Sequence, residues 1–181
     1  MILNSKRATA VHEAGHAVIG RVMAQECGEV TIIPDRSAMT AGYSITGDAW
    51  STIHAWDQAG RWREYRSITI GRIITLMAGR HAEEELRGVC QGGDGHDQRE
   101  IAMMVDEAGW GERGDTAGDA AVLLARLERF SRAAVRRHRK AIRALASELL
   151  KRKSMTADEV AEVLQPHLPR WHWPPRPKVF C

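Results

Sequence analysis

The sequence predicts a mainly α-helical protein that also contains a small β-hairpin, an α+β fold. Three segments, at about 5–26, 61–86 and 120–151, repeat apolar residues with the period of a helix. Residues 29–33 and 41–46 are instead rich in β-branched residues, and the short loop between them favours two adjacent strands. We therefore expect a core that is supplied mostly by helices.

The chain has 181 residues, which is enough for one domain with a sizeable core. It has no run of about eighteen apolar residues, and its first residues lack the apolar region of a secretory signal. Cys27, Cys90 and Cys181 show no C-x-x-C spacing, so we expect neither a disulfide framework nor a cysteine zinc site. These features predict a cytoplasmic protein that does not contact a membrane.

The formal net charge is only +3, but basic residues gather between Arg126 and Arg143. Such a cluster can attract the phosphates of nucleic acid. Because no base-reading motif accompanies it, we interpret the cluster as a solvated helix face. We predict no nucleic-acid partner.

The first helix contains the H-E-x-x-H motif His12-Glu13-Ala14-Gly15-His16. At about 100° and 1.5 Å per residue, His12 and His16 lie only about 40° apart and roughly 6 Å along one helix face. Val11, Gly15, Val18 and Val22 form a buried stripe beside them. Two imidazoles placed in this way can share one small cation.

The residue types of this motif suit a hydrolytic zinc site. Neutral imidazole binds Zn²⁺, which lowers the pKa of a bound water, and a nearby carboxylate can then take its proton. Glu13 lies about 60° round the helix from His16, close enough to act as that base. Gly15 costs about 1 kcal/mol of helix propensity relative to Ala, which indicates that another group approaches the backbone there.

The candidate strands 29–33 and 41–46 follow this helix and form the predicted hairpin. An exposed strand edge beside a metal site can receive a peptide as an added strand. We therefore predict that Ala41, Gly42 and Tyr43 bind substrate, and a purely structural hairpin is the alternative. Residues 47–60 show no clear periodicity, and we expect a loop.

The second long helix, at about 61–86, places Ile70, Ile73, Met77 and His81 on one side. Residues 78–85 are small and then acidic. The small residues favour close packing on the first helix, and the acids can orient metal ligands. A solvated acidic helix end is the alternative.

A catalytic zinc site takes three protein ligands and keeps one open position, so two histidines need a partner. Residues 89–96 are rich in glycine and lead into a helix that we expect to begin at Asp97. The glycines allow the backbone to bring this carboxylate to the metal. Asp94, His96 and Glu84 are alternative ligands, and Asp97 can also act simply as a helix cap.

The rest of the chain is predicted to be helical. We expect one long or two kinked helices over 120–151, and a capping box at 156–159 that starts a last helix ending at Leu164. The predicted core residues of the long segment are Val122, Leu123, Leu127, Phe130, Val135, Ile142, Leu145 and Leu149. We divide the chain into a domain over 1–168 and a Trp- and Pro-rich arm over 169–181.

Together these stretches resemble the zincin-like peptidase domain of the FtsH family of ATP-dependent zinc metalloproteases, peptidase family M41. The segments that carry the resemblance are His12-Glu13-Ala14-Gly15-His16-Ala17, Val30-Thr31-Ile32-Ile33-Pro34, Ala41-Gly42-Tyr43, Ala78-Gly79-Arg80-His81-Ala82-Glu83-Glu84 and Gly93-Asp94-Gly95-His96-Asp97. The resemblance implies that His12, His16 and Asp97 bind zinc and that Glu13 is the catalytic base. After Asp97 the family's Arg-Ala-Thr is missing and its Met-Val pair comes about one helical turn early, so Asp94 stays an alternative ligand.

The resemblance implies a zinc metalloendopeptidase that acts on unfolded or flexible polypeptide. The sequence has no G-x-x-x-x-G-K-[ST] phosphate loop, so we expect either an ATP-independent peptidase or a separate ATPase partner, with a homo-oligomer as a further expectation. The alternative function is a catalytically silent binding or regulatory module that keeps the fold.

Overall fold

The computed structural model describes residues 2–25, 27–34, 41–47, 49–58, 60, 65–90, 94–107 and 117–168. Its helices are α1 (Ile2–Val22), α2 (Ala49–Gln58), α3 (Tyr65–Arg87), α4 (Gly95–Glu107), α5 (Ala117–Arg152) and α6 (Ala157–Leu164). Its strands are β1 (Cys27–Thr31), β2 (Tyr43–Thr46) and β3 (Ser154–Met155). The prediction of a mainly helical α+β fold is confirmed.

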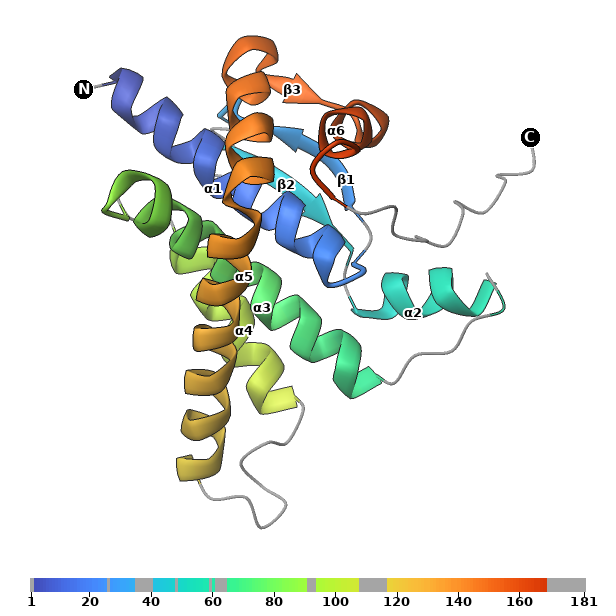
Figure 1. Ribbon diagram of the computed structural model, residues 1–181. Coiled ribbons are helices and arrows are strands. Elements are labelled where there is room, and N and C mark those ends of the chain that lie inside the picture. The colour runs from blue at the N-terminus through green and yellow to red at the C-terminus, as the bar shows by residue number, and fades with distance from the viewer. Residues whose placement is uncertain are drawn as a thin grey trace.

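Helices α1, α3 and α5 cross one another and enclose the core (Figure 1). From α1, Ala14, Ala17 and Val18 are fully buried, so this helix is covered on most of its surface. From α5, the buried residues Leu127, Val135, Ile142, Leu145 and Leu149 follow the helical period that the sequence shows. The core prediction is wrong for Val122 and Phe130, which are exposed. Phe130 lies on the outer face of α5, since its neighbours Leu127 and Ser131 are the buried residues of this part of the helix.

A short polar chain joins α3 to α5 inside this core. The hydroxyl of Ser131 donates a hydrogen bond to the carbonyl oxygen of Ile74 at 3.2 Å, and it lies 3.0 Å from Nδ1 of His81. Both side chains are buried, so each of these polar groups needs a partner within the protein. The contact fixes α5 against the helix that also supports the candidate metal centre.

The sheet has the order β2-β1-β3, and both pairings are antiparallel. The hairpin of β1 and β2 is therefore present as predicted, with Val30 opposite Ser44 and Thr31 opposite Tyr43. The third strand was not predicted, because two residues are too few to show alternation. Among the described strands β2 is an edge strand, and it packs on α1.

Some element boundaries differ from those predicted. Residues 49–58 form helix α2 instead of a loop, and α4 begins at Gly95, two residues before Asp97. The predicted capping box is present at the start of α6, where Thr156 and Glu159 exchange hydrogen bonds. Within the described part of the chain, no helix is both long and apolar enough to cross a membrane. The predicted arm over 169–181 lies outside the described residues.

Candidate metal centre

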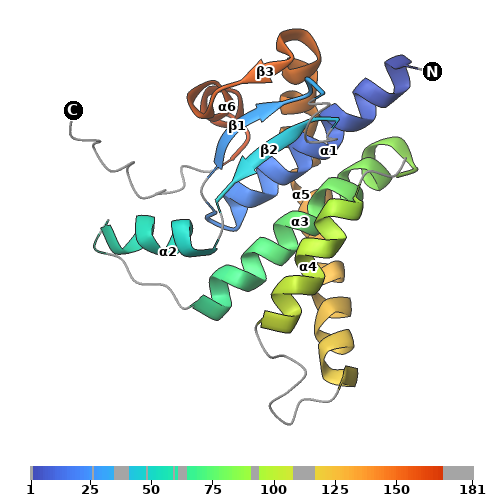
Figure 2. The same ribbon diagram turned by 180° about the vertical axis from the view of Figure 1, so that it is seen from behind.

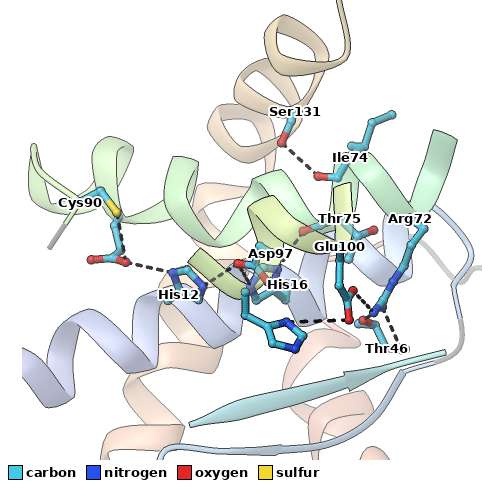
Figure 3. A network of polar contacts seen from close by, with 12 residues as sticks. His12, His16, Thr46, Arg72, Ile74, Thr75, Cys90, Asp97, Glu100 and Ser131 are labelled. Atoms are coloured by element: carbon cyan, nitrogen blue, oxygen red, sulfur yellow. Dashed lines mark hydrogen bonds and ion pairs between the residues drawn. The ribbon is translucent and has the colours of Figure 1, made fainter. Parts of the chain in front are cut away.

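Helix α1 brings His12 and His16 together on its inner face, as the helical spacing requires (Figure 3). The centroids of the two rings are 4.6 Å apart, and the ring planes meet at 78°. Only 9% of His12 and 7% of His16 is exposed. The two imidazoles are therefore neighbours in a site that is largely closed to water.

The imidazoles fit here because two glycines let α1 and α3 approach closely. A Cβ atom at Gly15 would lie 2.7 Å from the carbonyl oxygen of Ala78 and 2.8 Å from Cβ of Ala82. This contact explains the glycine between the histidines. On α3, a Cβ atom at Gly79 would lie 2.5 Å from Nε2 of His16 and 2.6 Å from Nε2 of His12. The space beside both Nε2 atoms thus remains open only because residue 79 has no side chain.

Each histidine uses its Nδ1 atom in a hydrogen bond to α3. Nδ1 of His12 donates to Oε1 of Glu83 at 2.9 Å, and Nδ1 of His16 donates to the carbonyl oxygen of Thr75 at 2.8 Å. Such bonds fix the orientation of a ring and direct its Nε2 atom toward a shared ligand. Glu83 is 1% exposed and also accepts a hydrogen bond from Arg87 at 2.9 Å. One of the acids in 78–85 therefore has the orienting position that we expected.

The other two acids of that segment lie outside the centre. Glu84 pairs with Arg80 at 2.9 Å and with Arg132, and Glu85 pairs with Arg136 at 3.4 Å. These contacts place Glu84 among arginines of α3 and α5, so it does not take part in the histidine cluster.

Asp97, in the first turn of α4, approaches both histidines (Figure 3). Its Oδ2 atom lies 3.2 Å from Nε2 of His12 and 3.3 Å from Nε2 of His16. Two donor atoms that each bind a tetrahedral zinc ion at about 2.0–2.1 Å are about 3.3 Å apart, so both distances fit such an ion. Each of the three residues offers one ligand atom, and these atoms lie within 4.8 Å of one another.

The alternative ligands near Asp97 lie elsewhere. Asp94 precedes the helix, and its carbonyl oxygen accepts a hydrogen bond from the backbone of Gln98 at 2.9 Å. The ring of His96 is exposed and lies 3.8 Å from Glu100. Among the described residues, only His12, His16 and Asp97 form a group that could hold a metal ion.

The electrostatics of this group favour a positive charge. Burial lowers the pKa of His12, but the hydrogen bonds with Asp97 and Glu83 outweigh burial and raise this pKa to about 10. Burial raises the pKa of Asp97, yet the bonds with His12 and His16 outweigh it and hold the pKa well below its usual range. Without a metal, His12 is therefore a cation between two carboxylates.

Glu13 lies beside this group, on the helix that carries both histidines. It is 7% exposed, and its charge interacts with those of His16, His12 and Asp97. Burial raises its pKa above the usual value, although the two histidines oppose this change. A buried carboxylate with a raised pKa holds a proton more readily than an exposed one, as a general base must.

The residues that we expected to bind substrate lie at the start of β2. Ala41 and Tyr43 are exposed, and Tyr43 is the first residue of the strand. Gly42 is close to other elements, because a Cβ atom there would lie 2.6 Å from the carbonyl oxygen of Thr31 and 2.7 Å from Cγ2 of Thr9. This glycine therefore lets the chain pass between β1 and α1.

A family model and several known proteins match this chain. A family model described as "Peptidase family M41" matches residues 1–113. The chain is 28% identical to an ATP-dependent zinc metalloprotease FTSH 9, chloroplastic/mitochondrial, of Oryza sativa subsp. japonica, over 92% of this chain and 23% of the relative. It is 26% identical to an ATP-dependent zinc metalloprotease FtsH of Marinobacter nauticus, over 88% of this chain and 29% of the relative.

A third similar protein is an ATP-dependent zinc metalloprotease FtsH of Acaryochloris marina. It is 33% identical over 56% of this chain and 14% of the relative. The chain thus spans less than a third of the length of each of these curated relatives.

Proposed function

Because the chain belongs to peptidase family M41, we propose that it is a zinc-dependent endopeptidase that hydrolyses peptide bonds in unfolded or flexible polypeptide. The observation that carries this proposal is the convergence of His12, His16 and Asp97 beside the buried Glu13. The donor set of two imidazoles and one carboxylate suits Zn²⁺ and leaves a coordination position open.

In this proposal, the residues around the centre have separate roles in hydrolysis. His12, His16 and Asp97 would hold the ion, while Glu83 and the carbonyl of Thr75 keep the two rings in place. Bound zinc would supply a Lewis acid that polarises the scissile carbonyl and makes water more acidic. Glu13 takes the proton of the attacking water and passes it to the leaving amine.

The substrate would bind along the outer edge of β2, with which no described strand pairs. An extended peptide can add to an edge strand through main-chain hydrogen bonds, which accept almost any sequence. The edge position of β2 and the exposure of Ala41 and Tyr43 support this assignment, with Gly42 between them. A peptide has to be extended to bind there, so we expect flexible chains to be cleaved without ATP and folded ones to need a separate ATPase.

Removal of the metal tests the proposal. The purified chain should bind one zinc ion and cleave a fluorescently labelled, casein-like unfolded protein. A chelator should abolish the cleavage, and added zinc should restore it, because no protein group in the centre replaces the Lewis acid.

The outcomes of this test are distinct. A chain that binds zinc but leaves the unfolded protein intact would be the catalytically silent binding module. A chain that binds no zinc would contradict the assignment of His12, His16 and Asp97 as ligands.

Zinc affinity should rise with pH. The pKa of His12 is raised to about 10, so near neutral pH zinc has to displace a proton from this ring. Affinity should therefore increase about tenfold for each pH unit between about pH 6.5 and 8.5. Competition with a chromophoric chelator, corrected for the chelator's own protonation, measures this slope. An affinity that does not change over this range would mean that His12 is already neutral there, so that the contacts with Asp97 and Glu83 do not raise its pKa.

A further inference from the structure

The candidate third ligand, Asp97, comes from helix α4, which is less buried than α1. The histidines stand on α1, where Ala14, Ala17 and Val18 are fully buried. In α4, Ile101 is the buried residue among those that the structure describes. Helix α4 packs mainly along α3 (Figure 2). Met104 and Val105 pack against the core but are only partly buried, so polar contacts in the first half of α4 also help to fix Asp97.

One arginine of α3 provides such a contact. Nη2 of Arg72 donates to Oε2 of Glu100 at 3.0 Å, and the two side chains are 11% and 31% exposed. Nη1 of the same guanidinium donates to the carbonyl oxygen of Thr46 at 2.8 Å and to its hydroxyl. Arg72 therefore joins α3 to α4 and to the last residue of β2 at one point (Figure 3).

This contact lies one helical turn from the candidate ligand. Glu100 is three residues after Asp97, which places both side chains on the same face of α4, about 4.5 Å apart along its axis. The ion pair of Glu100 therefore restrains both the rotation of α4 about its axis and the position along this axis of the turn that carries Asp97. Ligand distances in zinc sites vary by only about 0.2 Å, so even a small rotation would weaken the site.

We propose that Arg72 and Glu100 are positioning residues, which hold Asp97 at the metal and fix the end of strand β2 to the same guanidinium. The inference rests on the metal site proposed above. Neither residue belongs to the group His12, His16 and Asp97 that could hold the ion, and their effect passes through the placement of α4.

The test is the zinc affinity of Arg72→Ala in two backgrounds, measured by chelator competition. Loss of a group that supports a metal ligand typically weakens binding about 10- to 100-fold. We expect a loss of about tenfold in the otherwise unchanged protein, and almost no further loss when Asp97→Ala is already present, because Arg72 then has no ligand to position. A merely structural role would weaken binding equally in both backgrounds.

Two further variants complete the design. Glu100→Gln keeps the shape of the side chain and removes its charge, so it should weaken zinc binding several-fold even if Arg72→Ala fails to fold. Arg132→Ala is the matched control, because this arginine pairs with Glu84 of α3 and with Glu128 of its own helix, and none of its ion pairs among the described residues involves α4. It should leave zinc affinity unchanged.

The failure of this inference can be distinguished from failure of the proposed function. If the unmodified chain binds zinc and both Arg72→Ala and Glu100→Gln bind it equally well, only the positioning role is wrong. An equal loss in the two backgrounds would also overturn it. If the unmodified chain binds no zinc, the metal site itself is wrong.

Discussion

Glu13→Gln should abolish cleavage of an unfolded protein while zinc binding stays nearly unchanged. Glutamine has the shape of glutamate and fits the same buried position, where only 7% of Glu13 is exposed. It has no basic carboxylate, so the attacking water would have no proton acceptor. Removal of a general base typically costs about 10²- to 10⁴-fold in rate, and we expect a loss in this range. Initial cleavage rates and the zinc content of the purified variant measure the two effects.

Glu83→Gln is the matched control for this experiment. It makes the same change at another buried glutamate. Glu83, however, accepts the hydrogen bond from Nδ1 of His12 and has no proposed role in proton transfer. We expect it to weaken zinc binding, with activity recovering when zinc is in excess. Glu13→Gln should show the opposite pattern. Activity that persists in Glu13→Gln would remove Glu13 from the mechanism.

The parts of the centre that could be predicted from the sequence are those that depend on local geometry. His12, Glu13 and His16 lie within one and a half turns of a helix, so their spacing alone places them together. Asp97 was one of four candidates from the residues alone, and it was singled out by resemblance to family M41. Contact between residues so far apart in the chain depends on how α4 packs against α3, which no local pattern encodes.

The supporting contacts were harder to predict, each for a physical reason. Thr75 holds His16 through its backbone carbonyl, which every residue possesses, so the side chain gives no signal. Glu83 was predicted only as one of several acids. Its burial in the folded chain distinguishes it from Glu84 and Glu85. Arg72 and Glu100 are ordinary charged residues until the fold brings two helices and a strand end together.

In the fold, too, the features that depend on a local pattern were predicted, and those that depend on packing were not. Periodic segments such as 120–151 were predicted as helices because their apolar residues recur on one face. Helix α2 was missed because its ten residues are too few and too mixed for a clear period. Strand β3 has only two residues, and it forms because the turn after α5 brings Ser154 and Met155 beside β1. Such short elements are determined by the surrounding structure more than by their own composition.

Gly79→Ala should remove zinc binding with a smaller effect on the fold. The added Cβ atom would lie 2.5 Å from Nε2 of His16 and 2.6 Å from Nε2 of His12, so at least one ring has to move. Their Nδ1 bonds to Glu83 and Thr75, at 2.9 and 2.8 Å, leave neither ring free to turn away without losing a partner. A site with one displaced ligand should bind zinc at least about 100-fold more weakly.

Gly71→Ala is the matched control, because it makes the same substitution on the same face of α3, two turns earlier. There the added Cβ atom would lie 2.8 Å from Nε2 of Gln25, a fully buried side chain that is remote from the histidines. We expect Gly71→Ala to lower the midpoint of thermal unfolding and to bind zinc normally. Gly79→Ala should instead lose zinc binding, while the metal-free variant keeps the circular dichroism of a helical protein. Alanine gains up to about 1 kcal/mol of helix propensity over glycine at both positions, so propensity cannot account for a difference between the variants. If Gly79→Ala bound zinc as tightly as the unmodified chain, the ion would have to lie away from the space between the two Nε2 atoms.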